Sequence, residues 1–244
     1  MNVIKYQKKT IKNIFRYFGF DIQRHVPGLS NADIITSTLK NFKIDLVLDV
    51  GANIGQFSSD LRESGYKGNI ISFEPLSEAY SFLQKKAASD PRWIVHPRCA
   101  VGADICEIEI NIAGNSVSSS ILSMLDNHIS ASPDSEYIGK ESVPLVTIDS
   151  VLPDIIKNNN NLFLKIDTQG FENEVLNGAK NVMPQIRGIL LELSLVQLYE
   201  GQHLWQEMMS RLNDEGFVLW SILSNFTDID TGRTLQVDGI FFKA

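Results

Sequence analysis

The chain has 244 residues and a formal net charge of −7, with 43% hydrophobic and 21% charged residues. This composition is typical of one globular domain, with or without an appendage, and it excludes a collagen-like or wholly disordered chain. No run of about 18 apolar residues is present, so we expect no transmembrane helix. The first residues also lack the apolar core of a secretory signal, and two cysteines cannot form a disulfide framework. We therefore expect a reduced, cytoplasmic protein.

Positive charge is concentrated at the N-terminus. Residues 1–28 carry six basic residues and one acidic residue, which leaves a net charge of −12 on the remaining chain. Such an acidic domain is a poor candidate for binding nucleic-acid phosphates. Apolar residues recur at helical spacing beside a basic face in residues 3–18, which predicts an amphipathic helix within an N-terminal extension, 1–43. Two alternatives stay open for this helix: it docks on its own domain or a second subunit of a homo-oligomer, or it lies on an anionic membrane surface.

From residue 44 to 244, apolar runs alternate with segments of helical period, the pattern of a parallel sheet built from β-α-β units. We expect strands over 44–50, 69–74, 93–101, 107–112, 143–148, 162–167, 186–193, 217–223 and 235–243. We expect helices over 56–64, 77–89 (with Ser77 as N-cap), 150–156, 171–179 and 205–213. The Asp-Thr-Gly at 230–232 predicts a turn between antiparallel strands. The polar stretch 113–140 has little periodicity and is expected to be a binding loop or lid.

The strongest local signal is Asp-Val-Gly-Ala-Asn-Ile-Gly at residues 49–55, between an apolar strand and a helix. Glycines there allow a sharp turn and a close approach to a ligand, and the helix start offers free N–H groups. A dinucleotide fingerprint would need glycine at the positions of Gly51, Asn53 and Gln56, so that match fails. The spacing instead favours a smaller nucleoside-plus-amino-acid cofactor, and Asn53 tolerates left-handed backbone angles.

Glu74 follows at the end of the second strand, where an acidic side chain accepts hydrogen bonds from ribose hydroxyls in nucleotide-binding α/β folds. The alternative for Glu74 is a solvent-facing loop residue beside Pro75. Together with the glycine loop, Glu74 indicates an adenosine-type ligand.

Four further carboxylates lie at strand ends or inside apolar strands. Asp167 and Glu172 stand where the 162–167 strand runs into a helix, and Glu192 and Asp238 interrupt apolar strands. A buried carboxylate is costly unless it is paired or ligated, which makes these residues site candidates. Their structural alternatives are a turn or N-cap for Asp167, a helix-dipole role for Glu172, and satisfied structural carboxylates for the other two.

No other chemical motif stands out. The four histidines show no metal-ligand spacing, although His128 lies in the long polar stretch and could reach a substrate. The chain has neither a Gly-x-Ser-x-Gly elbow nor a phosphate-binding Gly-Lys-Ser/Thr loop, which argues against hydrolase and P-loop classes.

Five motifs in order along the chain resemble the FkbM family of S-adenosylmethionine-dependent methyltransferases, from about residue 45 to the C-terminus. They are Asp-Val-Gly-Ala-Asn-Ile-Gly at 49–55, Phe-Glu-Pro at 73–75, Val-Thr-Ile-Asp at 146–149, Lys-Ile-Asp-Thr-Gln-Gly-Phe-Glu at 165–172 with Val-Leu-Asn-Gly-Ala at 175–179, and Val-Asp-Gly at 237–239. The resemblance implies an α/β class I methyltransferase (Rossmann-like) fold, with a seven-stranded, mostly parallel sheet and an antiparallel last strand. It also implies O-methylation of a hydroxyl on a sugar, glycan or natural-product acceptor. A non-catalytic nucleoside-binding protein and an NAD-type oxidoreductase on a similar fold remain the alternatives.

The resemblance further implies roles for matching residues. Cofactor-binding residues for S-adenosylmethionine would be Asp49, Gly51, Asn53, Gly55, Glu74 and Pro75. Asp167 would be the base or metal-assisted base. Glu172 and Glu192 are catalytic candidates from their positions at the helix start and in an apolar strand, and not from the resemblance. The chemistry of the reaction, and not the resemblance, adds a Mg²⁺ ion held by Asp167 and Glu192 at adjacent strand ends, with Asp238 as a further ligand. The family motif usually has Glu where this chain has Gln169, which argues against residue 169 as a base. The resemblance leaves the N-terminal helix without a role.

Overall fold

The computed structural model describes residues 15–18, 30–152 and 161–243. Most of the predicted amphipathic helix over 3–18 lies outside these ranges, so the choice between its two alternatives stays open. Within the described ranges, no helix is long and apolar enough to span a membrane.

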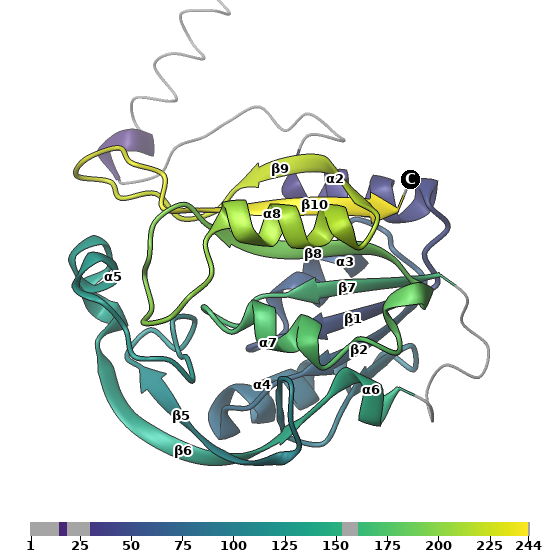
Figure 1. Ribbon diagram of the computed structural model, residues 1–244, viewed down its shortest axis with the longest axis horizontal. Helices are drawn as coiled ribbons and strands as arrows, with labels where there is room; N and C mark the ends of the chain where they lie inside the picture. The colour runs from purple at the N-terminus through teal and green to yellow at the C-terminus, as the bar shows by residue number, and fades with distance from the viewer. Residues whose placement is uncertain (1–14, 19–29, 153–160, 244) are drawn as a thin grey trace, which may run out of the picture.

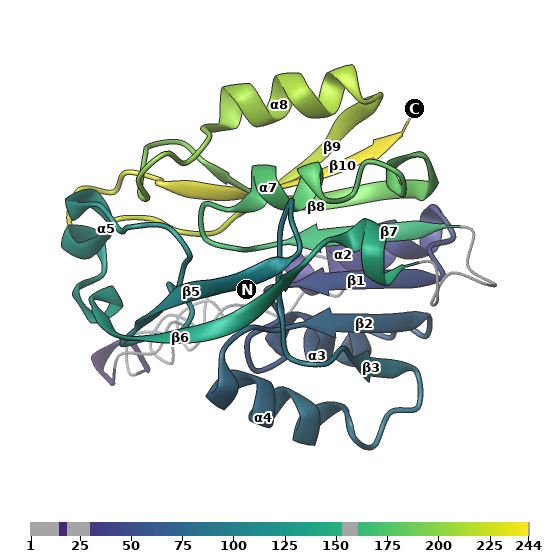
Figure 2. The same cartoon turned by 60° about the horizontal axis from the view of Figure 1, so that its bottom comes forward.

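A seven-stranded sheet with the order β3-β2-β1-β7-β8-β10-β9 forms the centre of the fold (Figures 1 and 2). Its strands are β1 (Leu46–Val50), β2 (Asn69–Phe73), β3 (Trp93–Val95), β7 (Leu162–Ile166), β8 (Ile186–Ser194), β9 (Phe217–Ser224) and β10 (Gln236–Lys243). The first five pair in parallel, and β10 runs antiparallel to both of its neighbours. The predicted class I methyltransferase fold is therefore confirmed.

Helices cover both faces of this sheet, which explains why every residue of β1 and of β7 is buried. One face carries α2 (Asn31–Asn41), α3 (Gln56–Glu63) and α4 (Ser77–Ala87), and the other carries α6 (Ile148–Val151), α7 (Glu172–Asn177) and α8 (Trp205–Asp214). Helix α2 belongs to this packing, because its Ile35 and Leu39 join the same apolar cluster as Val47 of β1.

The register of the central strands sets the place of the site. Val50 pairs with Phe73 of β2 on one side and with Ile166 of β7 on the other. The three strands run in parallel, so the residues that follow them, Gly51, Glu74 and Asp167, meet at one edge of the sheet.

The 93–101 segment departs from the predicted single strand. It divides around Pro97 into β3 and β4 (Ala100–Val101), and β4 belongs to a second, three-stranded sheet with the order β4-β6-β5. Proline lacks the N–H that a continuing strand would need, which accounts for the break. The other strands of this sheet are β5 (Cys106–Ala113) and β6 (Tyr137–Val146), which pair antiparallel (Figure 2).

Three other local predictions are corrected. Leu76, and not Ser77, is the N-cap of α4; Ser77 donates its N–H and hydroxyl to Glu141 of β6 at 3.0 and 2.9 Å. The polar stretch 113–140 is not a loop throughout, since it contains α5 (Asp126–Ala131), a 3₁₀ turn (Pro133–Ser135) and the start of β6. The helix predicted over 150–156 begins earlier, as α6, and residues 153–160 lie outside the described ranges.

Candidate functional site

A cavity of about 450 Å³ opens at the carboxyl edge of the central strands. Its walls include the loop after β1, the end of β2, β4, and residues of the 113–140 stretch such as Ser116 and Ile121. Helix α2 and the ends of β9 and β10 also contribute, through Asn31, Asn225 and Asp238. Ligands of open α/β sheets bind at this edge, so the cavity is the candidate site.

The glycine loop takes its shape from the neighbouring strand. Gly51 has a φ of +73°, and a Cβ at this position would lie 1.9 Å from the backbone oxygen of Asp167. Glycine is therefore required here by the close approach of two chain segments. Asn53 adopts the left-handed conformation predicted for it, with a φ of 46°, and its side-chain oxygen accepts the N–H of Ile54 at 2.7 Å.

Glu74 connects the end of β2 to this loop. One carboxylate oxygen accepts the N–H of Asn53 at 2.7 Å, and the other accepts the N–H of Leu76 at 2.9 Å. The residue is only 3% exposed and lines the cavity, so the alternative of a solvent-facing loop residue is wrong. Burial raises the pKa of Glu74 to about 7, although both backbone N–H groups favour the ionised form.

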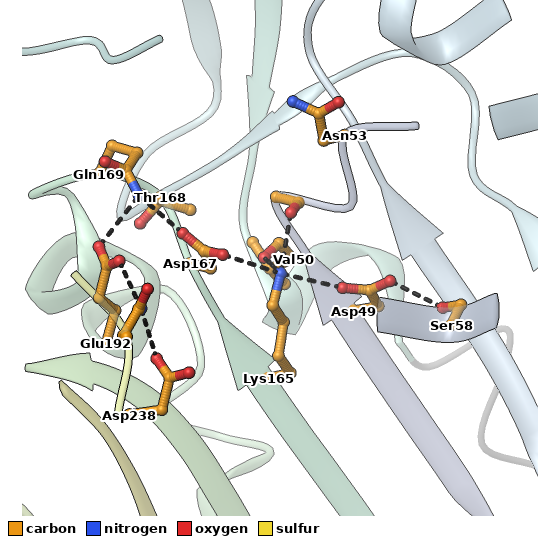
Figure 3. Close-up of polar contacts among 12 residues, drawn as sticks. Asp49, Val50, Asn53, Ser58, Lys165, Asp167, Thr168, Gln169, Glu192 and Asp238 are labelled. Carbon is orange, nitrogen blue, oxygen red and sulfur yellow. Dashed lines mark hydrogen bonds and ion pairs between the residues drawn. The ribbon is translucent and has the colours of Figure 1, made fainter. Parts of the chain in front are cut away.

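Lys165 of β7 is a site residue that the sequence analysis missed. Its ammonium lies 3.2 Å from Asp49, 3.5 Å from Asp167 and 2.9 Å from the backbone oxygen of Gly51 (Figure 3). Burial opposes its charge, but the two aspartates outweigh burial and hold the pKa of Lys165 above its ordinary value. Asp49 accepts a second hydrogen bond, from the hydroxyl of Ser58 at 2.7 Å. The sequence pattern could have identified Lys165 as a site residue, because this charged residue interrupts an apolar strand in the same way as Glu192.

Three of the four predicted carboxylates meet beside the cavity. Asp238 pairs directly across the strands with Glu192, and Asp167 follows Ile166, which pairs with Leu191. Asp167 is partly open, with 38% of its side chain exposed, whereas Glu192 is buried. Burial and the charge of Asp167 raise the pKa of Asp238 to about 6 and that of Glu192 well above its ordinary value.

Two side-chain amides link these carboxylates. The amide nitrogen of Gln169 donates to Asp167 at 2.9 Å and to Glu192 at 3.0 Å. The amide nitrogen of Asn225 donates to the other oxygen of Glu192 at 3.0 Å and to Asp238 at 2.9 Å. Figure 3 shows the Gln169 amide lying between Asp167 and Glu192.

This donor set does not fit the predicted Mg²⁺ ion. Magnesium requires oxygen lone pairs, whereas amide N–H donors already point at all three carboxylates. Among the residues that the structure describes, no group of three or more His, Cys, Asp or Glu side chains could hold a metal ion.

Glu172 lies apart from the three other carboxylates. One of its oxygens accepts the N–H groups of Thr168 and Gly170, both at 3.0 Å, and the hydroxyl of Thr168 at 3.2 Å. The residue is 5% exposed and is not part of the cavity wall. Glu172 therefore holds the turn after β7, a structural role in addition to the helix-dipole alternative, and its catalytic role stays a prediction.

His128 does not reach the cavity either. Its Nε2 lies 3.2 Å from the hydroxyl of the fully buried Tyr199, and its Nδ1 lies 2.9 Å from the hydroxyl of Ser135. Burial lowers the pKa of His128. The Tyr199 hydroxyl also donates to the side-chain oxygen of Gln169 at 2.8 Å. Tyr199 was not predicted to be part of the site.

A comparison with protein-family models gives a match. Residues 49–219 match the family model described as the methyltransferase FkbM domain. A comparison with curated proteins gives no match.

Several solved structures are similar to the chain. One is methyltransferase FkbM from Methylobacillus flagellatus, with 16% identity and a TM-score of 0.48 over 82% of this chain and 43% of that one. This chain therefore spans less than half of that protein. Another is the magnesium protoporphyrin IX methyltransferase from Synechocystis with bound S-adenosylmethionine, with 13% identity and a TM-score of 0.48 over 97% of both chains. A third is an S-adenosylmethionine-dependent methyltransferase from Clostridium acetobutylicum, with 9% identity and a TM-score of 0.46 over 87% of this chain and 90% of that one.

Proposed function

Because the chain belongs to the FkbM family of methyltransferases, we propose that it transfers a methyl group from S-adenosylmethionine to a hydroxyl of a sugar, glycan or natural-product acceptor. The matched residues, 49–219, make up more than half of the chain. Membership of this family implies S-adenosylmethionine as the methyl donor, whereas the acceptor and its hydroxyl are the proposal.

One observation supports the proposal most strongly: Gly51, Asn53, Glu74 and Asp167 all line the same cavity. A donor-binding loop, an acid suited to ribose hydroxyls and a carboxylate that could act as a base are thus within reach of one ligand. The NAD-type alternative still lacks the required glycines at residues 53 and 56.

The chain's own groups have separate tasks in this proposal. The donor supplies a methyl group that is already electrophilic, so alignment of the reacting atoms accounts for much of the acceleration. The carboxylate of Glu74 would accept hydrogen bonds from the ribose of the donor, and the 51–55 loop would surround its amino-acid part. Asp167 would take the proton of the acceptor hydroxyl as that oxygen accepts the methyl group, and the bound donor would leave as its neutral thioether. Lys165 and Gln169 hold the carboxylate of Asp167 in place.

Calorimetry tests the donor site. Wild type is expected to bind S-adenosylhomocysteine and not NAD, and Glu74→Gln should weaken this binding about 10- to 100-fold. A hydrogen bond to a charged group contributes about 1.5–3 kcal/mol, which corresponds to that range. Glu78→Gln makes the same charge change at an exposed position of α4 and should leave the affinity unchanged. A preference for NAD, or equal affinities of Glu74→Gln and wild type, would contradict the donor assignment.

Transfer of a labelled methyl group to a panel of hydroxylated sugars and glycans tests the base. Asp167→Asn should bind S-adenosylhomocysteine like wild type but transfer about 10²- to 10⁴-fold more slowly, the usual contribution of general base catalysis. Asp104→Asn, at an exposed position, is the matched control. Near-normal transfer by Asp167→Asn would remove Asp167 from the mechanism, and consumption of the donor by neither protein would favour the non-catalytic alternative.

A further inference from the structure

The side chain of Gln169 uses all of its hydrogen-bonding groups. Its nitrogen donates to Asp167 and Glu192 at 2.9 and 3.0 Å, and its oxygen accepts the hydroxyl of Tyr199 at 2.8 Å. Tyr199 is fully buried, so this hydroxyl is not exchanged for water. The amide is therefore oriented with its N–H groups toward the carboxylates and its oxygen toward Tyr199.

The backbone at Gln169 is held as firmly as the side chain. Its φ of 55° lies in the left-handed region, which costs a non-glycine residue on the order of 1–3 kcal/mol. Such a conformation persists only where surrounding contacts determine it. The hydroxyl of Ser120 supplies one of them, because it donates to the backbone oxygen of Gln169 at 2.6 Å.

A second amide repeats this arrangement on the far side of Glu192. Asn225 donates to the remaining oxygen of Glu192 and to Asp238, so an amide N–H faces each oxygen of Glu192. A divalent cation between these carboxylates would need the oxygen lone pairs to which the N–H groups point. The partial positive charge of the amide hydrogens reduces carboxylate repulsion in the way that a cation would.

We propose that Gln169 is a positioning residue whose amide takes the place of a divalent cation between Asp167 and Glu192, so that this centre works without a metal ion. The inference deepens the proposed function, since it concerns how the base of that reaction is held. The N–H donors of the amides point at the Asp167–Glu192–Asp238 group, and the absence of a metal ion is proposed for this group alone. Exchanging the amide for a carboxylate should then create the missing metal site.

Binding of Mn²⁺, followed by electron paramagnetic resonance, tests this directly and needs no acceptor. We expect Gln169→Glu to bind Mn²⁺ at least about tenfold more tightly than wild type, and the double variant Gln169→Glu/Asp167→Asn to lose that gain. Gln56→Glu adds the same charge on another part of the cavity wall and should gain nothing. In wild type, the affinity for S-adenosylhomocysteine should be the same in EDTA and in Mg²⁺.

Two results would overturn the inference: Mn²⁺ binding by wild type that Asp167→Asn abolishes, or no gain in Gln169→Glu when that variant still binds S-adenosylhomocysteine. If Gln169→Glu does not fold, Asn225→Asp makes the same exchange of amide for carboxylate at the second amide. If Asn225→Asp then gains no affinity for Mn²⁺, the inference is likewise overturned. Failure of wild type to bind S-adenosylhomocysteine refutes the proposed function instead, whatever Mn²⁺ does. The two failures are therefore distinguishable.

Discussion

Replacing Lys165 by Met removes the buried cation that joins the ends of β1 and β7. Methionine keeps the apolar stem of the side chain but leaves Asp49, which is fully buried, without its ion pair. Asp49 retains the hydrogen bonds from the hydroxyls of Ser58 and Ser72, and these bonds do not neutralise its charge. The expected result is a large loss of stability with little change in packing.

The size of this loss of stability depends on the burial of the ion pair and not on the distance between its two charges. The Lys165–Asp49 pair is 3.2 Å long with side-chain exposures of 6% and 0%, whereas the Lys140–Glu109 pair is 3.4 Å long with exposures of 59% and 70%. Removing one partner of a buried pair costs about 3–5 kcal/mol, because the other charge stays buried and unpaired. An exposed pair contributes about 0–1 kcal/mol. Lys140→Met is therefore a matched control with nearly the same distance.

Urea unfolding followed by tryptophan fluorescence measures both variants. Lys165→Met should lower the free energy of unfolding by about 3–5 kcal/mol, and Lys140→Met by no more than about 1 kcal/mol. The double variant Lys165→Met/Asp49→Asn should recover about 0.5–3 kcal/mol, since a neutral amide needs no counter-charge. Equal losses at Lys165 and Lys140 would refute the reasoning, because burial would then have no effect on the pair.

Two further predictions concern pH and the glycine loop. Burial raises the pKa of Glu74 and Glu172 from 4.5 to about 7. Each group therefore favours folding most below pH 4.5, and this contribution, about 3 kcal/mol, is lost as pH rises from 4.5 to 7. The free energy of unfolding should be larger at pH 5 than at pH 8, with a smaller difference in Glu74→Gln; equal values in wild type would contradict the burial argument. Gly51→Ala should cost several kcal/mol more than Gly216→Ala in urea unfolding, since both have positive φ but only Gly51 has Asp167 at 1.9 Å from the added Cβ and Gly216 has open space. Equal costs would show that the loop can move away from β7.

The local sequence pattern was sufficient for the central strands of the sheet and for their carboxyl ends. Apolar runs mark β1 and β7. The residues that follow these strands, Gly51 and Asp167, are site candidates from the sequence pattern alone. Strand period and turn chemistry depend on a few neighbouring residues, so the sequence carries them directly. The same reasoning could not separate β3 from β4 by sheet, because the partner of β4 lies more than 40 residues further along the chain.

The chemistry around Asp167 depended on contacts that no local pattern encodes. Asn225 reaches Glu192 across 33 positions of sequence, and Tyr199 reaches Gln169 across 30. The sequence by itself determined which carboxylates stand at strand ends; only the tertiary structure decided that two side-chain amides lie between them. The physical reason is that a charge or N–H group acts over a few ångströms of space, whatever its separation along the chain, and folding alone sets those distances.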